Sequence, residues 1–297
     1  MLLIFVDGVG LAPEGPGNPL ATEPMPALRA LLGGAMTAER AQRRDGLLLA
    51  PLDATLGVPG LPQSATGQTA LFTGVNGAAL LGRHATAFPG PRLRQVIAAA
   101  SLFKRAREAG RSATFANAYA GGVADEARGE SRASVTTWAV RAAGLPLRGL
   151  GELARGEAVS WDVCRDRFAR RAGIALGPVA ASVAGGHLAA LTADHDLTVY
   201  ESFLTDLAGH RRFGITAREA LERIDGLLQG ALAGLPAEAT LLLTSDHGNV
   251  EDATTRLHTR NPVPLLAVGP GAAAFAGLDS LLEVTPAILR TLAAPPS

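Results

Sequence analysis

The chain has 297 residues, of which 47% are hydrophobic, with 35 glycines and 19 prolines, a composition typical of a globular protein with one large domain or a core domain and a smaller companion. Its 27 Lys and Arg residues balance 27 Asp and Glu residues, so it lacks the basic surface that a phosphate backbone requires, and nucleic acid is not an expected partner. A single cysteine, Cys164, excludes an internal disulfide, and no stretch reaches the roughly 18 uninterrupted apolar residues of a membrane span, so we expect a cytoplasmic protein without a membrane partner.

Four apolar segments have the pattern of fully buried strands. The first, 2–6, ends at Asp7 and is too short for the apolar core of a secretion signal. The others are 198–204, which precedes Asp206, 239–244, which precedes Asp246, and 263–268, which precedes a glycine-proline turn. Helix-like segments lie at 26–32, 69–73, 217–233 and 281–292. This alternation predicts a parallel α/β sheet, in which ligands collect outside the carboxyl ends of the strands.

The middle of the chain has a different character. Residues 91–190 contain a strand candidate at 112–119 and Arg-rich helical segments at 102–108 and 161–171, but no carboxylate at a strand end. We therefore predict three parts: a first part of a metal-binding core at 1–90, an inserted α/β cap at 91–190, and the second part of the core at 191–297.

Carboxylates and imidazoles that could bind metal follow the predicted strands. The side chains of Asp246 and His247 point in divergent directions because the residues are adjacent, so they suit two neighbouring ions better than one. His258, in a proline-stiffened turn, can bring a third imidazole. Asp206 and His210 are four residues apart, the spacing that puts both on one face of a helical turn.

Each of these residues also has a simpler interpretation. Asp246 could cap a helix, His258 could be a loop histidine, Asp7 could be a turn residue, and the Asp206/His210 pair could be a surface ion pair. Their shared position at strand ends favours a metal site. The triplet 194–196, Asp-His-Asp, lies at the opposite edge of the sheet, and we interpret it as structural.

Ser64 precedes a helix in a turn of small residues. A hydroxyl at a helix N-terminus lies beside unsatisfied N–H groups, which attract phosphate and stabilise an alkoxide, so Ser64 is a candidate nucleophile. Alternatively, Ser64 or Thr66 only caps the helix. A bound cation could activate the hydroxyl without a Ser-His-Asp triad. Candidate substrate contacts are Gln68, Arg83 and His84.

The ordered set of motifs resembles the alkaline phosphatase superfamily, specifically its cofactor-independent phosphoglycerate mutase and phosphopentomutase branch. The motifs are Asp7-Gly8, Ser64-x-x-Gly67, Asp206-x-x-x-His210, Asp246-His247-Gly248-Asn249 and His258-Thr-x-Asn-Pro-Val-Pro. The resemblance covers roughly 1–90 and 195–270. It implies a mostly parallel sheet flanked by helices, with two divalent ions, Mn²⁺ or Zn²⁺, at the strand ends. One ion would take Asp206, His210 and His258, and the other Asp7, Ser64, Asp246 and His247.

The resemblance also implies a reaction. Ser64 would attack a small phosphomonoester to give a phosphoserine, and the phosphoryl group would pass to water, as in a hydrolase, or to a substrate hydroxyl, as in an isomerase. The sequence departs from the branch at Gln68, where a histidine is expected. The middle segment, of about 100 residues, is closer in size to the phosphopentomutase cap than to the large inserted domain of phosphoglycerate mutase. Its arginines, such as Arg128, Arg132 and Arg165, could bind a substrate anion.

The predicted function is therefore a two-metal phosphomutase or phosphatase with a small phosphorylated substrate. Two alternatives stay open. One is a metal-dependent phosphodiesterase or another hydrolase with a different leaving group. The other is a non-catalytic metal-binding protein. The sequence does not predict an oligomeric state.

Overall fold

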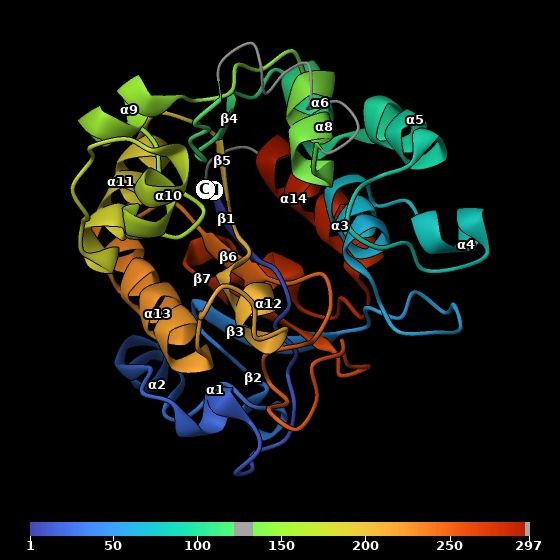
Figure 1. Cartoon of the computed structure of the whole chain (residues 1–297). Helices are drawn as coiled ribbons and strands as arrows, with labels where there is room; N and C mark the ends of the chain where they lie inside the picture. The colour runs from blue at the N-terminus through green and yellow to red at the C-terminus, as the bar shows by residue number, and fades with distance from the viewer. Residues whose placement is uncertain (122–132, 295–297) are drawn as a thin grey trace.

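A seven-stranded sheet with helices on both faces forms the centre of the molecule (Figure 1). The computed structural model describes residues 1–121 and 133–294. Its strands are β1 (Leu2–Val6), β2 (Gln42–Arg44), β3 (Leu47–Leu52), β4 (Ala113–Phe115), β5 (Leu197–Ser202), β6 (Leu241–Thr244) and β7 (Val263–Val268). They lie in the order β2-β3-β7-β6-β1-β5-β4. The predicted α/β class is confirmed.

The central strand β1 is parallel to both of its neighbours, β5 and β6, and β4 is parallel to β5. Its side chains alternate between two cores: Leu3 and Phe5 pack on one face of the sheet, and Leu2, Ile4 and Val6 on the other. A strand buried on both faces needs an unbroken apolar sequence. This is why the segment 2–6 is recognisable from its composition.

The strand β7 runs opposite to the direction that its pattern suggested. It is antiparallel to β6 and to β3, and β2 is antiparallel to β3. Five of the seven strands, β1, β3, β4, β5 and β6, still point the same way, so the sheet is mostly parallel in strand direction. Because β7 is reversed, the residues before it lie at the edge where β1, β5 and β6 end.

Helices cover the sheet on both sides (Figure 1). One face carries α1 (Pro19–Thr22), α2 (Pro26–Leu32), α11 (Ala181–Ala193) and α13 (Ala217–Gly234). The other carries α3 (Ser64–Thr73), α5 (Pro91–Ala100), α6 (Leu102–Glu108), α8 (Val135–Ala142) and α14 (Val284–Ala293). Shorter helices are α4 (Gly77–Leu81), α9 (Leu150–Arg155), α10 (Asp166–Ala172) and α12 (Leu204–Gly209), with 3₁₀ turns η1 (Ala38–Arg40), η3 (Pro270–Phe275) and η4 (Leu281–Glu283).

Most predicted helices match the structure closely. The segments 26–32 and 102–108 coincide with α2 and α6, and 217–233 is one residue shorter than α13. The segment 69–73 is the second half of α3, and 281–292 is divided between η4 and α14. In the part of the chain that the structure describes, no helix combines the length and apolarity needed to cross a membrane.

The middle segment shares the sheet and the cores with the rest of the chain. Its β4 pairs with β5, and Phe103, Phe115 and Val140 belong to the same apolar cluster as Phe5. A smaller cluster of its own contains Ala118, Leu153, Ala158 and Phe168. In the part of the chain that the structure describes, the boundaries at 91 and 190 therefore do not separate two independent cores. The covering role of the middle segment stays a prediction. Arg128 and Arg132 lie outside the described residues.

Two glycines permit close packing at the carboxyl edge of the sheet. A Cβ added at Gly67 in α3 would lie 2.5 Å from the carbonyl oxygen of Asp246, at the end of β6. A Cβ added at Gly8, where φ is +75°, would lie 2.9 Å from the Cα atom of Asp206. Both contacts are shorter than van der Waals packing allows. These glycines therefore let α3 and α12 approach the strand ends.

We expect Gly67→Ala to destabilise the protein by about 1–3 kcal/mol, because the added methyl group forces α3 away from β6. The free energy of unfolding in urea measures this effect. The control is Gly186→Ala in α11, where an added Cβ meets nothing within 4 Å, and helix propensity predicts a gain of roughly 0.5–1 kcal/mol. Equal stability changes in the two variants would contradict the role of close packing at Gly67.

Candidate metal centre

Seven predicted ligand residues meet at one edge of the sheet, although they come from five places in the sequence. Asp7 follows β1, and Asp206 and His210 lie in and directly after α12, which follows β5. The pair 246–247 follows β6, Ser64 begins α3, and His258 precedes the reversed strand β7. The sheet topology therefore converts distant sequence positions into neighbours.

The first group surrounds the imidazole of His247. Its Nε2 atom lies 3.0 Å from Ser64 Oγ, 3.3 Å from Asp7 Oδ1 and 3.5 Å from Asp246 Oδ2. The side chains of Asp246 and His247 are fully buried, and that of Asp7 is 9% exposed. One nitrogen and three oxygens thus converge in a nearly closed space.

The second group contains Asp206, His210 and His258. The two imidazole Nε2 atoms are 3.0 Å apart, and they lie 3.3 and 3.4 Å from Asp206 Oδ1. The groups adjoin, because the His247 and His258 rings stack with centroids 3.7 Å apart. Ligand atoms of Asp206, His247 and His258 all lie within 4.8 Å of one another, as do those of Asp7, Asp246 and His247.

Backbone carbonyls orient two of these imidazoles. His258 Nδ1 donates to Pro62 O at 2.8 Å, and His210 Nδ1 donates to Arg256 O at 2.7 Å. A carbonyl oxygen only accepts, so each Nδ1 carries the proton. Each ring therefore turns its Nε2 atom toward the other ring and toward Asp206, as metal-binding histidines do when a hydrogen bond holds the second ring nitrogen.

The electrostatics of the site fit a divalent cation. Burial raises the pKa of Asp7 well above its usual range, and the charges of Asp246 and Asp206 raise it further. Burial would also raise the pKa of Asp206, but the neighbouring imidazoles of His210 and His258 outweigh it and lower that pKa. Burial lowers the pKa of His247. Within residues 1–121 and 133–294, Asp7 Oδ1 and Asp206 Oδ1 are buried without hydrogen-bond partners. A bound cation would compensate both the repulsion among the carboxylates and the unpaired oxygens.

Ser64 does not cap its helix. The N-cap of α3 is Gln63, which makes no capping hydrogen bond, and Thr66 Oγ1 donates to the carbonyl of Gln63 at 3.0 Å. The Ser64 hydroxyl instead faces His247. The alternative interpretation of Ser64 as a simple cap is therefore not what the structure shows.

Gln68 differs from its predicted role as a substrate contact. It is buried, and its amide nitrogen donates to Asp7 Oδ2 at 3.1 Å and to Asp246 Oδ2 at 3.2 Å. A side-chain amide has two N–H donors, so Gln68 can bridge both carboxylates. Gln68 thus lies against the carboxylates and relieves part of their repulsion. The sequence did not predict this contact, because its pattern does not reveal which neighbours a helical side chain meets.

The other two candidate substrate contacts lie near the start of α3. His84 Nε2 is 3.2 Å from Val58 O, and its Nδ1 is 3.4 Å from Thr66 Oγ1. Arg83 is exposed, and its guanidinium lies 3.5 Å from the carbonyl of His84. Arg83 and His84 both lie near Ser64. Their contact with a substrate stays a prediction.

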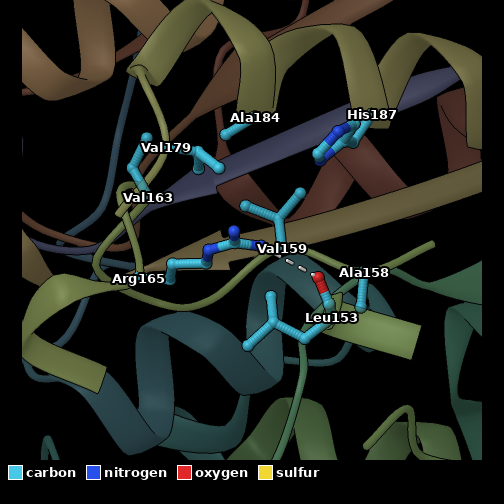
Figure 2. A pocket seen from close by; sticks show the side chains of 8 residues that line it. All are labelled: Leu153, Ala158, Val159, Val163, Arg165, Val179, Ala184 and His187. Atoms are coloured by element: carbon cyan, nitrogen blue, oxygen red, sulfur yellow. Dashed lines mark hydrogen bonds between the residues drawn. The ribbon is translucent and has the colours of Figure 1, made fainter. Parts of the chain in front are cut away.

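Two other histidines lie outside the centre. His195 Nδ1 is 2.9 Å from Leu191 O, and Asp196 accepts hydrogen bonds from the backbone and hydroxyl of Ser112 at the start of the strands. Figure 2 shows His187 and Arg165 among the side chains that line a pocket. This pocket has no room for a water molecule. The guanidinium of Arg165 donates to the carbonyls of Leu153 and Gly177. Arg165 therefore joins backbone segments here instead of facing an open anion site.

Glu201 is a buried residue of this edge that was not among the predicted site residues. It lies on β5 and has a pKa raised to about 7, mainly by burial, with a contribution from the charge of Asp246. An acidic residue inside a predicted buried strand was the available signal. Its carboxyl adds a further titratable group to the buried carboxylates at this edge.

The chain is similar in sequence to one family model and to proteins of known name. The Metalloenzyme superfamily model matches residues 178–296. A 2,3-bisphosphoglycerate-independent phosphoglycerate mutase from Dinoroseobacter shibae is 33% identical over 124 residues, or 39% of this chain and 25% of that protein. A phosphopentomutase from Chromohalobacter salexigens is 48% identical over 67 residues, or 23% of this chain and 16% of that protein. The matched segments thus span a quarter or less of these two relatives.

The structural comparison covers nearly the whole chain. The alkaline phosphatase from the Antarctic bacterium TAB5 superposes with a TM-score of 0.55 and 14% identity, over 98% of this chain and 96% of that chain. The chain therefore has an alkaline-phosphatase-like α/β fold. Within that class, the chain carries the Metalloenzyme superfamily signature in its second half and has mutases among its sequence relatives, which confirms the predicted resemblance.

We expect Glu201→Gln to change how stability depends on pH in the metal-free protein. Between its ordinary pKa of 4.5 and the folded value of about 7, the folded state keeps a proton that the unfolded chain releases. The stability of the wild type therefore falls over this range, by about 3 kcal/mol, and stays lower above it.

Glutamine does not titrate, so the variant should gain stability relative to the wild type as the pH rises from 4.5 to 8. Urea unfolding with a chelator present, repeated across this range, measures the difference. A stability difference that is constant with pH would show that Glu201 does not hold its proton in the fold.

Proposed function

We propose that the protein is a two-metal phosphoryl-transfer enzyme that acts on small phosphomonoesters through phosphorylated Ser64. The observation that carries this proposal is the Ser64 hydroxyl, which begins α3 and lies 3.0 Å from His247, beside two adjoining groups of carboxylates and imidazoles. The names of the relatives, two mutases and an alkaline phosphatase, favour phosphate esters as substrates.

We assign the ligands to two cation sites. The first would use Asp206, His210 and His258, and the second would use Asp7, Ser64, Asp246 and His247. Their oxygen and imidazole atoms suit Mn²⁺ or Zn²⁺. When bound, such cations would withdraw charge from the serine hydroxyl and the phosphoryl oxygens and so supply Lewis acidity. His247 lies where the two groups adjoin.

The chain's own residues would position the reacting groups. The Ser64 oxygen would attack phosphorus in line with the leaving oxygen. The Ser64 O–P bond forms and the ester P–O bond breaks, while the Ser64 hydroxyl loses its proton and the leaving oxygen takes one up. His247 keeps the hydroxyl at the edge of the sheet, and the N-terminal N–H groups of α3 attract the phosphoryl oxygens. Arg83 and His84, beside that terminus, are proposed substrate contacts.

A second transfer would restore Ser64. Attack by water on the phosphoserine releases inorganic phosphate, whereas attack by a substrate hydroxyl gives an isomeric phosphoester. Exclusion of water by a covering segment favours the second outcome. We place this enzyme in the cytoplasm, where a reducing environment suits its single, half-buried cysteine.

We expect Ser64→Ala to reduce turnover of phosphomonoesters by about 10³-fold or more, as loss of a nucleophile does, while the fold is retained. Initial rates with added Mn²⁺ and detection of phosphorylated protein by intact-mass measurement test this. Thr69→Val is the matched control, because it removes another hydroxyl of α3 that bonds to Ala65 O instead of facing His247. Full activity in Ser64→Ala would remove Ser64 from the mechanism.

We expect phosphomonoesters to be turned over faster than phosphodiesters. A panel of both classes, assayed with Mn²⁺ or Zn²⁺ for phosphate release and for isomeric products, separates the candidate activities. Phosphate release identifies a phosphatase, and accumulation of an isomer identifies a mutase. A strong preference for diesters would favour a phosphodiesterase, and stoichiometric metal without any turnover would favour a non-catalytic metal-binding protein.

A further inference from the structure

The carboxylate of Glu251 is a buried group that the proposed reaction does not use. The residue is 1% exposed. Oε2 accepts the backbone N–H groups of Gly10 at 2.9 Å and Asn249 at 2.7 Å, and Oε1 accepts the amide of Asn261 at 3.0 Å and the hydroxyl of Thr259. A carboxylate has only acceptor sites, so it can receive all four donors at once.

These four hydrogen bonds join three loops of the candidate metal centre. Gly10 lies in the loop that carries Asp7 away from β1, and Asn249 lies in the loop that carries the pair 246–247 away from β6. Thr259 and Asn261 lie in the segment that leads from His258 into β7. One side chain therefore connects loops from both proposed cation sites.

Glycines enclose this carboxylate on two sides. A Cβ added at Gly10 would lie 2.2 Å from Glu251 Oε1, and a Cβ added at Gly248 would also lie 2.2 Å from it. Both backbones thus approach the carboxylate more closely than any other residue would permit. The Glu251 side chain is held in a fitted socket and has no freedom to turn toward a substrate.

Glu251 is one of the connections that hold the segment around His258, together with the hydrogen bond from Leu11 N to Pro262 O at 2.6 Å. β7 begins only at Val263, so His258 lies five residues outside the sheet ladder. Beyond Glu251, one backbone contact anchors the segment to the loop after β6, where Thr259 N donates to Gly248 O at 2.9 Å. The position of His258 relative to His247 decides how far apart the two ligand groups lie.

We propose that Glu251 is a positioning residue that fixes the spacing between the two cation sites by tying the His258 segment to the loops of Asp7 and His247. This inference rests on the proposed two-metal function. Glu251 acts through backbone and side-chain donors and contacts none of the assigned ligand atoms.

The experiment uses Co²⁺ alone as a probe of the full chain. We expect the wild type to bind two Co²⁺ ions. We expect Glu251→Ala to weaken the binding of the second Co²⁺ ion by about 10–100-fold, which is the usual effect of losing a group that orients metal ligands. The visible absorption of bound Co²⁺, which reports ligand geometry, should change in intensity or position. Thermal unfolding confirms that each variant is folded.

Two conservative variants sharpen the test. In Glu251→Gln, the amide oxygen can still accept both backbone N–H groups, and the NH₂ group can donate to Thr259 Oγ1 and to a rotated Asn261 amide. This variant should recover most of the cobalt affinity and the wild-type absorption. Thr259→Val keeps the side-chain shape but removes one link to the His258 segment, so it should show a weaker form of the Glu251→Ala effect.

Asp225→Ala is the matched control. Asp225 is 3% exposed, and it accepts the backbone N–H groups of Ala27 at 3.0 Å and Leu28 at 2.8 Å, so its loss also removes a buried carboxylate with backbone partners. It should lower stability without changing cobalt affinity or absorption. An equal loss of cobalt affinity in Asp225→Ala would show that the effect of Glu251→Ala comes from general destabilisation. That result would overturn the inference.

The remaining outcomes separate the two proposals. A folded wild type that binds no Co²⁺ would overturn the two-metal function, and the role of Glu251 with it. A second outcome is that the wild type binds two Co²⁺ ions and that Glu251→Ala folds with unchanged cobalt affinity and absorption. This outcome would overturn the positioning role alone. If Glu251→Ala does not fold, unchanged cobalt binding in Thr259→Val would overturn it.

Discussion

Repulsion among buried carboxylates is the constraint on which this edge of the sheet depends. Asp7, Asp206 and Asp246 follow three adjacent strands, so the parallel topology that gathers them also forces their charges together. The chain compensates with several groups: three imidazoles, the bridging amide of Gln68 and backbone N–H groups. These groups leave some carboxylate oxygens unpaired in the part of the chain that the structure describes, and cations at those oxygens would complete the compensation.

Gln68 shows how a single departure from the expected motif can be accommodated. The resemblance predicts histidine at this position, and a neutral imidazole has one N–H donor. The amide has two, and the structure uses both, one on Asp7 and one on Asp246. Because an amide does not titrate, this bridge is independent of pH over the range in which an imidazole would change its charge.

The parts predicted best from the sequence are those determined locally. Buried strands such as 2–6 need continuous apolar residues, and the carboxylates at their ends interrupt that pattern visibly. The reversal of β7, the pairing of β4 with β5 and the burial of Gln68 between two carboxylates all depend on which distant segments meet. Periodicity carries no information about such partners. The motifs therefore indicated the candidate ligand residues, but they did not indicate the strand direction that brings His258 to the others.

The central position of β1 also has a consequence for biosynthesis. This strand precedes both of its neighbours in the sheet by a long stretch of sequence, because β5 and β6 begin at Leu197 and Leu241. The apolar strand must therefore stay unpaired during synthesis until those distant segments have also been made, and such long-range pairing is slow. The candidate ligand groups converge only after that pairing, so cation binding would stabilise a late stage of folding.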